Sequence, residues 1–338
     1  MNEIVLRNVI KKYSLKSNVF NQLRGKVKEV YAVNDVSLTI DCHEITGLIG
    51  ESGCGKSTLA KLILHLEDIT TGEILFDNQK VTLNSKEDNI AFRKRLQLVF
   101  QDPYESLDPR FQVVNILQEP LKNLRIYSSS KDKQMEIMKQ ALEDVSLVPP
   151  DSFLQRYPYQ LSGGQRQRVS IARALICNPE YLVADEPISM LDVSIRAGIL
   201  TLLKRLQQER NIGCLIITHD LATARYVCDE IVVMYLGKIV ESGRASILMD
   251  DFAHPYSMLL LKSAPDLFFN ESGYKRPPIS TEVMDAINPP NGCKFAPRCS
   301  YCTSICQEEE PCLENFNKDE QHKIACHHYK EIIKKRSN

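Results

Sequence analysis

The sequence predicts an α/β fold with a small antiparallel sheet, a helical insertion and a cysteine-rich C-terminal extension. A glycine-rich turn follows an apolar run at 44–49 and opens a helical pattern at 59–66. Later apolar runs at 96–100, 181–184 and 214–218 each end in polar or charged side chains. Runs of this kind, separated by helical patterns, are typical of buried strands in an α/β core.

The composition limits the possible functions. The 338 residues are enough for about two domains, and the formal net charge of -1 gives no reason to expect a nucleic-acid partner. No apolar stretch approaches the roughly 18 residues that cross a bilayer. The start, Met1-Asn2-Glu3, lacks the basic segment of a signal peptide. We therefore expect a cytoplasmic protein that binds no nucleic acid.

The N-terminal residues predict two strands, Ile4 to Tyr13 and Val30 to Ile40, of a small antiparallel sheet. The segment between them, Ser14 to Glu29, is polar, basic and loop-like. Tyr13 ends the first strand, where its ring could stack on a purine base. Packing of the ring against the sheet would explain the same residue.

The glycine-rich turn matches G-x-x-x-x-G-K-[ST] completely, with a strand before it and a helix after it. Its glycines let successive N–H groups converge on phosphate oxygens, and the helix N-terminus adds partial positive charge. Lys56 can reach the outer phosphates, and the Ser57 hydroxyl can ligate magnesium. The sequence therefore predicts a nucleotide-phosphate site. Its residues are Gly50, Ser52, Gly53, Cys54, Gly55, Lys56, Ser57 and Thr58.

Cys54 lies inside this loop, close to Lys56 and to a helix N-terminus. One hypothesis is that both lower the pKa of the thiol and make it an oxidation-prone switch. The alternative is that Cys54 is simply a small residue that fits the loop.

Strands are predicted at 72–76 and 96–100, and Gln101 follows the second of them. A glutamine amide at a strand end can ligate magnesium through its oxygen and orient a water through its nitrogen. Helical spacing at 111–124 and 133–147 predicts a mostly helical insertion over 102–160.

A second anion-binding helix end is predicted after this insertion. Leu161-Ser162-Gly163-Gly164-Gln165 begins a helix, and a serine with two glycines at a helix N-terminus can bind an anion without a lysine.

Two further strand ends carry groups suited to hydrolysis. The run 181–187 ends in Asp185 and Glu186. Asp185 can hold a magnesium shell and Glu186 can accept a proton from an attacking water. Ser189 to Asp192 turn into a helix over 193–208, and the strand 214–218 ends at His219, which could hydrogen-bond a terminal phosphate.

Taken in order, these motifs resemble the nucleotide-binding subunit of an ATP-binding cassette (ABC) transporter over about the first 245 residues. The resemblance implies a P-loop NTPase (RecA-like) core in an ATPase domain at 1–253. It also implies that two such domains close head to tail, so that the Leu-Ser-Gly-Gly-Gln helix of one completes the ATP site of the other.

The resemblance assigns roles to individual residues. Tyr13 corresponds to the adenine-stacking aromatic, with Phe20 and Tyr31 as alternatives. Gln101 corresponds to the magnesium and coupling glutamine, and Lys56 belongs to the catalytic set. The remaining roles are Asp185 for magnesium, Glu186 for the catalytic base and His219 for the switch histidine.

A narrower resemblance links the chain to the ATPases of oligopeptide, dipeptide and nickel importers, and most closely to the second ATPase subunit of an oligopeptide importer. It rests on Gln101 to Arg110, Leu191 to Ile195, His254-Pro255-Tyr256 and the stretch 287–299. The implied partners are a sibling ATPase forming a heterodimer, two membrane permease subunits and an extracellular substrate-binding protein. The implied location is the cytoplasmic face of the membrane. Peptides are the expected cargo, with nickel or a metal chelate as the alternative.

The tail, 291–338, follows a helix and a proline-containing linker over 254–290 and holds six of the 11 cysteines. In a reducing compartment such a group indicates metal rather than disulfides. The spacing lacks the paired C-x2-C of a zinc ribbon. It resembles the importer family's tail, in which four cysteines are associated with a 4Fe-4S cluster; here these are Cys293, Cys299, Cys306 and Cys326.

Zinc and unmetallated thiols are the alternatives for the tail. Cys302 and Cys312 are additional to the family's pattern, and Cys299-x2-Cys302 offers a zinc-like pair. The histidines His322, His327 and His328 lie nearby in the sequence and could serve as further ligands.

The sequence disfavours two other classes of function. A cytosolic cassette ATPase of repair or translation would bring a duplicated cassette or a long coiled coil, and the sequence shows neither repeat nor heptad run. A non-catalytic regulatory ATP binder would usually lack Glu186 or His219, and both are present.

Overall fold

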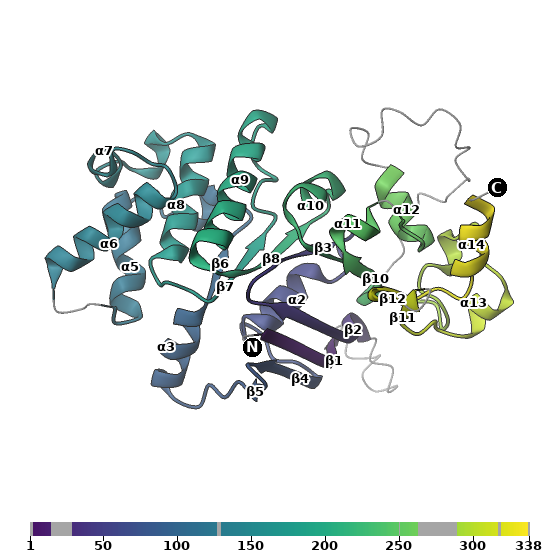
Figure 1. The fold of residues 1–338 in the computed structure, drawn as a ribbon. Coiled ribbons are helices and arrows are strands. Elements are labelled where there is room, and N and C mark those ends of the chain that lie inside the picture. The colour runs from purple at the N-terminus through teal and green to yellow at the C-terminus, as the bar shows by residue number, and fades with distance from the viewer. Residues whose placement is uncertain are drawn as a thin grey trace, which may run out of the picture. The chain divides into compact units, whose positions relative to one another are not determined.

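The computed structural model describes residues 3–14, 29–126, 130–249, 251–262, 289–316 and 319–336 (Figure 1). The chain forms two compact units. Unit 1 contains residues 1–4, 40–45 and 76–217, and unit 2 contains residues 5–39, 46–75 and 218–338. Within the described ranges, no helix has both the length and the apolar character that a membrane span requires.

Unit 1 is built on parallel strands in the order β8-β7-β6. These are β6 (Leu96–Val99), β7 (Tyr181–Asp185) and β8 (Gly213–Thr218). Val99 pairs with Ala184, and Asp185 pairs with Ile217. The register therefore brings the residues that follow β6 and β7 to the same edge of the sheet. The three predicted strands are confirmed, although the first ends at Val99 rather than at Phe100.

Most of the remaining elements of unit 1 are helices, of which α5, α6 and α8 lie side by side (Figure 1). The predicted helical insertion is confirmed. The helix expected from residue 133 begins at Lys131, because Ser130 caps it by accepting a hydrogen bond from the Lys133 N–H. A short strand, β5 (Gln79–Lys80), precedes these helices. The helices are α3 (Lys86–Arg95), α4 (Pro103–Ser106), α5 (Val113–Asn123), α6 (Lys131–Asp144), α7 (Pro150–Leu154), η1 (Pro158–Gln160), α8 (Gly163–Leu175) and α9 (Val193–Arg210).

Unit 2 contains strands in the order β11-β12-β10-β9-β3. β3 runs parallel to β9, and the remaining pairs are antiparallel. β12 belongs to the cysteine-rich tail, and its pairing with β10 places Ile324 opposite Glu241. The strands are β3 (Ile45–Ile49), β9 (Glu230–Tyr235), β10 (Lys238–Arg244), β11 (Glu314–Phe316) and β12 (Asp319–Ile324).

A second sheet has the order β2-β1-β4, with β1 at Glu3–Ser14, β2 at Glu29–Asp41 and β4 at Thr71–Phe76. These strands confirm the N-terminal predictions. The predicted basic loop falls largely on 15–28 and the predicted linker on 263–288, both outside the described residues. The helices of unit 2 are α2 (Lys56–Ile63), α10 (Leu221–Val227), α11 (Ala245–Leu248), α12 (Pro255–Lys262), η2 (Ala296–Arg298), α13 (Ser304–Glu308) and α14 (Tyr329–Arg336).

A buried carboxylate fastens the tail to β10. Glu241 is 0% exposed and accepts hydrogen bonds from the N–H groups of Ala253 at 2.8 Å and His254 at 3.2 Å. Its Oε1 also lies 2.9 Å from Nε2 of His322, whose ring stacks on Phe316 at 4.1 Å. A buried carboxylate needs such partners, because burial without them costs several kcal/mol. The pairing of β12 and this polar cluster together join the tail to the cassette strands of unit 2.

Candidate functional site

The glycine-rich turn at 50–58, called the phosphate loop from here on, leads into a helix as predicted, but α2 (Lys56–Ile63) begins and ends earlier than the predicted 59–66. Gly55, the residue before the helix, has φ 108°, and Gly53 has φ 80°. A Cβ on Gly50 would collide with the Met234 carbonyl oxygen, and one on Gly55 with the Ala32 carbonyl oxygen. No atom lies within 4 Å of the corresponding position on Gly53. Gly53 is therefore required only for its left-handed backbone, whereas Gly50 and Gly55 also allow close backbone packing.

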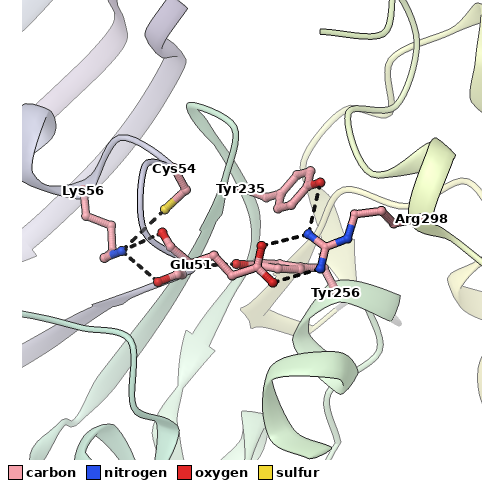
Figure 2. Close-up of polar contacts among 7 residues, drawn as sticks. Glu51, Cys54, Lys56, Tyr235, Tyr256 and Arg298 are labelled. Atoms are coloured by element: carbon pink, nitrogen blue, oxygen red, sulfur yellow. Dashed lines mark hydrogen bonds and ion pairs between the residues drawn. The ribbon is translucent and has the colours of Figure 1, made fainter. Parts of the chain in front are cut away.

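Lys56 points back over the loop (Figure 2). Its ammonium donates hydrogen bonds to the carbonyl oxygens of Gly50 at 2.7 Å and Glu51 at 2.9 Å, and lies 3.7 Å from Sγ of Cys54. The lysine is only 6% exposed, so these carbonyl groups replace much of its hydration. The next two residues of α2 differ in burial: Ser57 is exposed and Thr58 is half-buried.

Glu51 connects the loop to elements much later in the chain (Figure 2). Its two carboxylate oxygens accept hydrogen bonds from Nη1 and Nη2 of Arg298 at 2.8 and 2.9 Å, and its N–H donates to the Tyr256 hydroxyl at 2.7 Å. Nη1 of Arg298 also lies 3.4 Å from the Tyr235 hydroxyl. Sequence reasoning missed this group, because no local pattern relates residues 51 and 298.

The hypothesis that Cys54 is an activated thiol is wrong. Cys54 is 3% exposed, and this burial raises the pKa of its thiol despite the opposing charge of Lys56. Desolvation of the thiolate outweighs the neighbouring cation, so the net shift in the pKa of Cys54 is upward. The alternative, a small residue that fits the loop, agrees with the structure.

Tyr13 is the second-last residue of β1 and is 37% exposed. Its hydroxyl donates a hydrogen bond to Glu67, while partial burial raises its pKa and a hydrogen bond with Thr58 opposes that rise. Tyr13 thus lies beside the helix that carries the phosphate loop. The alternative Tyr31 has the Lys12 ammonium 4.6 Å from its ring centre, and Phe20 falls outside the described residues.

In unit 1, the structure brings Gln101 and Glu186 together. The Gln101 amide nitrogen donates a hydrogen bond to Oε2 of Glu186 at 3.1 Å. This contact orients the amide so that its oxygen, a magnesium ligand in principle, faces away from the carboxylate. Asp185, the last residue of β7, is half-buried.

Glu186 has a left-handed backbone with φ 43°, although it is not a glycine. The conformation costs roughly 1–2 kcal/mol for such a residue. It is held by a hydrogen bond from the Glu186 N–H to the Ile217 carbonyl at 2.9 Å and by Ser189, whose hydroxyl donates to the Glu186 carbonyl at 3.1 Å. Backbone strain of this kind is found at sites where a side chain must point in one direction.

The predicted second anion-binding helix end is the start of α8. Ser162 caps the helix: its hydroxyl accepts from the Gln165 N–H at 3.3 Å, and the Gln165 side chain accepts from the Ser162 N–H at 3.0 Å. This capping box fixes the chain direction at Gly163 and Gly164. A Cβ on Gly164 would lie 2.6 Å from Cγ2 of Ile195, so a larger residue has no room there.

The predicted nucleotide residues divide between the two units. Tyr13, the loop at 50–58 and His219 belong to unit 2, and His219 is an exposed residue directly after β8. Gln101, Asp185, Glu186 and the capped helix start at 162–165 belong to unit 1.

The four cysteines of the predicted cluster line one pocket in unit 2. Cys293, Cys299, Cys306 and Cys326 share its wall with His254, His327 and His328, among other residues. Cys302 and Cys312 are absent from the lining, and His322 contacts Glu241 instead. No disulfide joins the six tail cysteines, all of which the structure describes.

Burial and hydrogen bonding act in opposite directions on these thiols. Burial raises the pKa of Cys299 and of Cys326 to about 12, and also raises that of Cys293. Backbone N–H groups oppose the rise by donating to the sulfurs, from Tyr301 to Cys299 and from His328 to Cys326. Within the described ranges, no three of the four sulfurs lie within 4.8 Å of one another.

Comparison with known families gives two matches. The family model described as "ABC transporter" matches residues 33–189. The model described as "Oligopeptide/dipeptide transporter, C-terminal region" matches residues 240–306.

Two curated relatives extend over almost the whole chain. The chain is 41% identical over 328 residues to the oligopeptide transport ATP-binding protein AppF of Bacillus subtilis (strain 168), covering 96% of each chain. It is 39% identical over 318 residues to the dipeptide transport ATP-binding protein DppF of Haemophilus influenzae, covering 94% of each chain.

Solved structures confirm the predicted α/β cassette fold. The post-hydrolysis dimer of the ATP-binding cassette MJ0796 bound to ADP and Pi aligns with a TM-score of 0.62 and 31% identity, covering 72% of this chain and 98% of that chain. CbiO1 from Clostridium perfringens, part of the ABC transporter complex cbiONQ, aligns with a TM-score of 0.62 and 25% identity. The alignment covers 73% of this chain and 90% of that chain.

Two glycines of the loop give a matched pair of substitutions. Gly53→Ala should cost about 1–2 kcal/mol of unfolding free energy, because only the left-handed backbone opposes it. Gly55→Ala should cost roughly 3 kcal/mol or more, since its Cβ also collides with the Ala32 carbonyl. Urea denaturation of the full chain measures both. Equal destabilisation would show that the packing of Gly55 is not limiting.

The raised pKa of Cys54 predicts slow alkylation that depends on pH. At about pH 8 its thiolate is scarce, so iodoacetamide should modify exposed Cys312 and leave Cys54 intact; modification of Cys54 should rise only at more alkaline pH. Peptide mass spectrometry of the native protein measures both sites. Comparable alkylation rates of Cys54 and Cys312 near neutral pH would mean that Lys56 lowers the pKa of the Cys54 thiol.

Proposed function

This chain belongs to the ATP-binding subunits of the oligopeptide and dipeptide ABC transporters, and from that premise we propose that it hydrolyses ATP to drive peptide uptake across the cytoplasmic membrane. The observation that carries the proposal is the presence, in one chain, of the cassette at 33–189 and of this transporter group's C-terminal region at 240–306.

The phosphate loop is the proposed binding site for the ATP phosphates. Backbone N–H groups at the start of α2 would donate to the phosphates, and Lys56 supplies a buried positive charge there. Tyr13, beside the same helix, is the proposed partner of the adenine ring. The exposed Ser57 hydroxyl is available as a magnesium ligand.

The residues after β6 and β7 are the proposed hydrolytic group. Mg²⁺ neutralises the charge that develops on the phosphate oxygens when it is bound. We assign Ser57, Gln101 and Asp185 to hold it. Glu186 would accept the proton of the attacking water, and its contact with Gln101 keeps the carboxylate directed. His219 would hydrogen-bond the terminal phosphate.

The capped start of α8 supports a head-to-tail dimer with a sibling ATPase. Ser162, Gly163, Gly164 and Gln165 form a helix end suited to an anion, yet the loop at 50–58 already provides this chain's own phosphate-binding residues. We propose that 162–165 bind the ATP held by the sibling. The aligned cassette MJ0796 is dimeric with ADP and Pi bound.

Permease subunits and an extracellular substrate-binding protein complete the proposed transporter. The chain would associate peripherally with the permeases at the cytoplasmic face, in keeping with the lack of a membrane-spanning helix among the described residues. Cargo is selected by the partners. Mass spectrometry of what the purified cognate binding protein holds tests the peptide assignment, and a bound nickel or metal chelate would replace it.

The tail pocket is the proposed site of a 4Fe-4S cluster. Four thiolates are the normal complement of ligands for that cluster, and backbone N–H donors to sulfur are common around it. The pocket brings together the sulfurs of Cys293, Cys299, Cys306 and Cys326, and backbone N–H groups donate to Cys293, Cys299 and Cys326. Zinc held by four thiolates is the alternative occupant of the same pocket. A cluster bound there would join the four cysteines and so cross-link the segments of the tail that carry them.

Glu186→Gln tests the hydrolytic assignment. The assembled transporter carrying this variant should bind ATP normally but hydrolyse it about 100- to 10,000-fold more slowly, because a positioned general base is lost. Glu209→Gln, an exposed carboxylate on α9, serves as the control and should keep wild-type turnover. Phosphate release measures both. Wild-type turnover of Glu186→Gln would mean that another group is the base.

Metal analysis tests the tail. Protein purified anaerobically should contain about four iron atoms and about four acid-labile sulfides per chain. Cys299→Ser, within the pocket, should lower the iron content, and Cys312→Ser, outside it, should not. Stoichiometric zinc without iron, or no metal at all, would contradict the cluster.

A further inference from the structure

Arg298 makes a partly buried ion pair that ATP hydrolysis by itself does not explain. Its side chain is 5% exposed, and it holds the Glu51 carboxylate with two parallel hydrogen bonds of 2.8 and 2.9 Å (Figure 2). The pairing raises the pKa of the guanidinium. Two-pronged arginine–carboxylate pairs fix both distance and orientation, so this contact defines where Glu51 lies.

The surroundings of Arg298 are rigid. The guanidinium lies 5.8 Å from the ring centre of Tyr235 and 5.6 Å from that of Phe295. Tyr235 and Tyr256 pack at 4.6 Å, and Phe295 packs on them at 5.3 and 5.5 Å. This aromatic cluster comes from β9, α12 and the residue before η2, and all of it belongs to unit 2. An arginine packed among such rings has few alternative positions.

Glu51 transmits this constraint to Lys56. Its carboxylate is held by Arg298, its N–H by the Tyr256 hydroxyl, and its carbonyl oxygen accepts from the Lys56 ammonium. Residues of the C-terminal region therefore fix the position of Glu51. The carbonyl oxygen of Glu51 in turn sets the position of the Lys56 ammonium. A shift of Glu51 would move the carbonyl oxygen that holds the Lys56 ammonium. The positive charge proposed to bind phosphate would then move with it.

We propose that Arg298 is a positioning residue for the phosphate loop, so that a side chain of the cysteine-rich region sets the affinity of the loop for ATP. The inference rests on the proposed role of the loop as the ATP site and is independent of which metal the pocket holds. Arg298 directly precedes Cys299, which lines the cysteine pocket. The residue that holds the phosphate loop is therefore next in sequence to a pocket residue.

Nucleotide titration of the full chain tests the proposal. Arg298→Met should raise the Kd for Mg-ATP about tenfold, equivalent to about 1.4 kcal/mol. Arg298→Lys, which keeps the charge but loses the two-pronged contact, should give an intermediate Kd. Combining Glu51→Gln with Arg298→Met should add little to either alone, because both remove the same contact.

Controls separate positioning from folding. Glu310→Gln removes ion pairs to Lys238 and Lys294 in the same region without touching the loop, and should leave the Kd unchanged. In the assembled transporter, Arg298→Met should raise the KM for ATP more than it lowers kcat, because Glu186 is unaffected. Iron content and the thermal transition are recorded for every variant.

These measurements distinguish the positioning role of Arg298 from the proposed function of the chain. Unchanged ATP affinity in a folded Arg298→Met, or a loss of affinity matched by Glu310→Gln, would overturn the positioning role. A wild-type chain that binds no ATP would instead overturn the proposed function.

Discussion

The structure of unit 2 depends on direct backbone packing of the phosphate loop against its neighbours. Gly50 and Gly55 leave no room for a side chain because carbonyl groups of Met234 and Ala32 occupy that space. A loop packed in this way cannot relax, so its carbonyl oxygens can hold the Lys56 ammonium in one place despite the cost of burying it. The binding of phosphate then relies on geometry already present in the loop.

The hydrolytic residues follow from a second constraint, the register of parallel strands in unit 1. Because Val99 lies opposite Ala184, the residues after β6 and β7 emerge at one edge, and Gln101 reaches Glu186. The left-handed backbone of Glu186 is tolerated because the Ile217 carbonyl and Ser189 hold it on both sides. The strain stays local while the rest of the sheet remains regular.

The cysteine-rich tail is joined to the cassette strands of unit 2 rather than appended to them. Strand β12 extends the order β10-β9-β3, and the buried carboxylate of Glu241 connects β10 to His322 and to the start of α12. The Arg298 contact lies in the same region and reaches Glu51. A metal pocket, a sheet edge and the phosphate loop therefore share one packed set of residues, which explains how a tail could affect a nucleotide site without contacting the nucleotide.

The sequence alone determined the features that depend on neighbouring residues. The loop at 50–58, the cap at Ser162 and the strands that end at Asp185 and Thr218 follow from local spacing. Family resemblance singled out Cys293, Cys299, Cys306 and Cys326; the structure places them around one pocket, and their role as cluster ligands stays a prediction. Sequence reasoning misses β9 and β10, and it left two readings of Cys54 open, an activated thiol and a small residue that fits the loop. Only the tertiary structure showed that burial outweighs those charges, that β12 pairs with β10, and that Arg298 holds Glu51 across 247 positions. The physical reason is that desolvation and long-range ion pairs depend on which segments pack together, and local spacing carries no record of that.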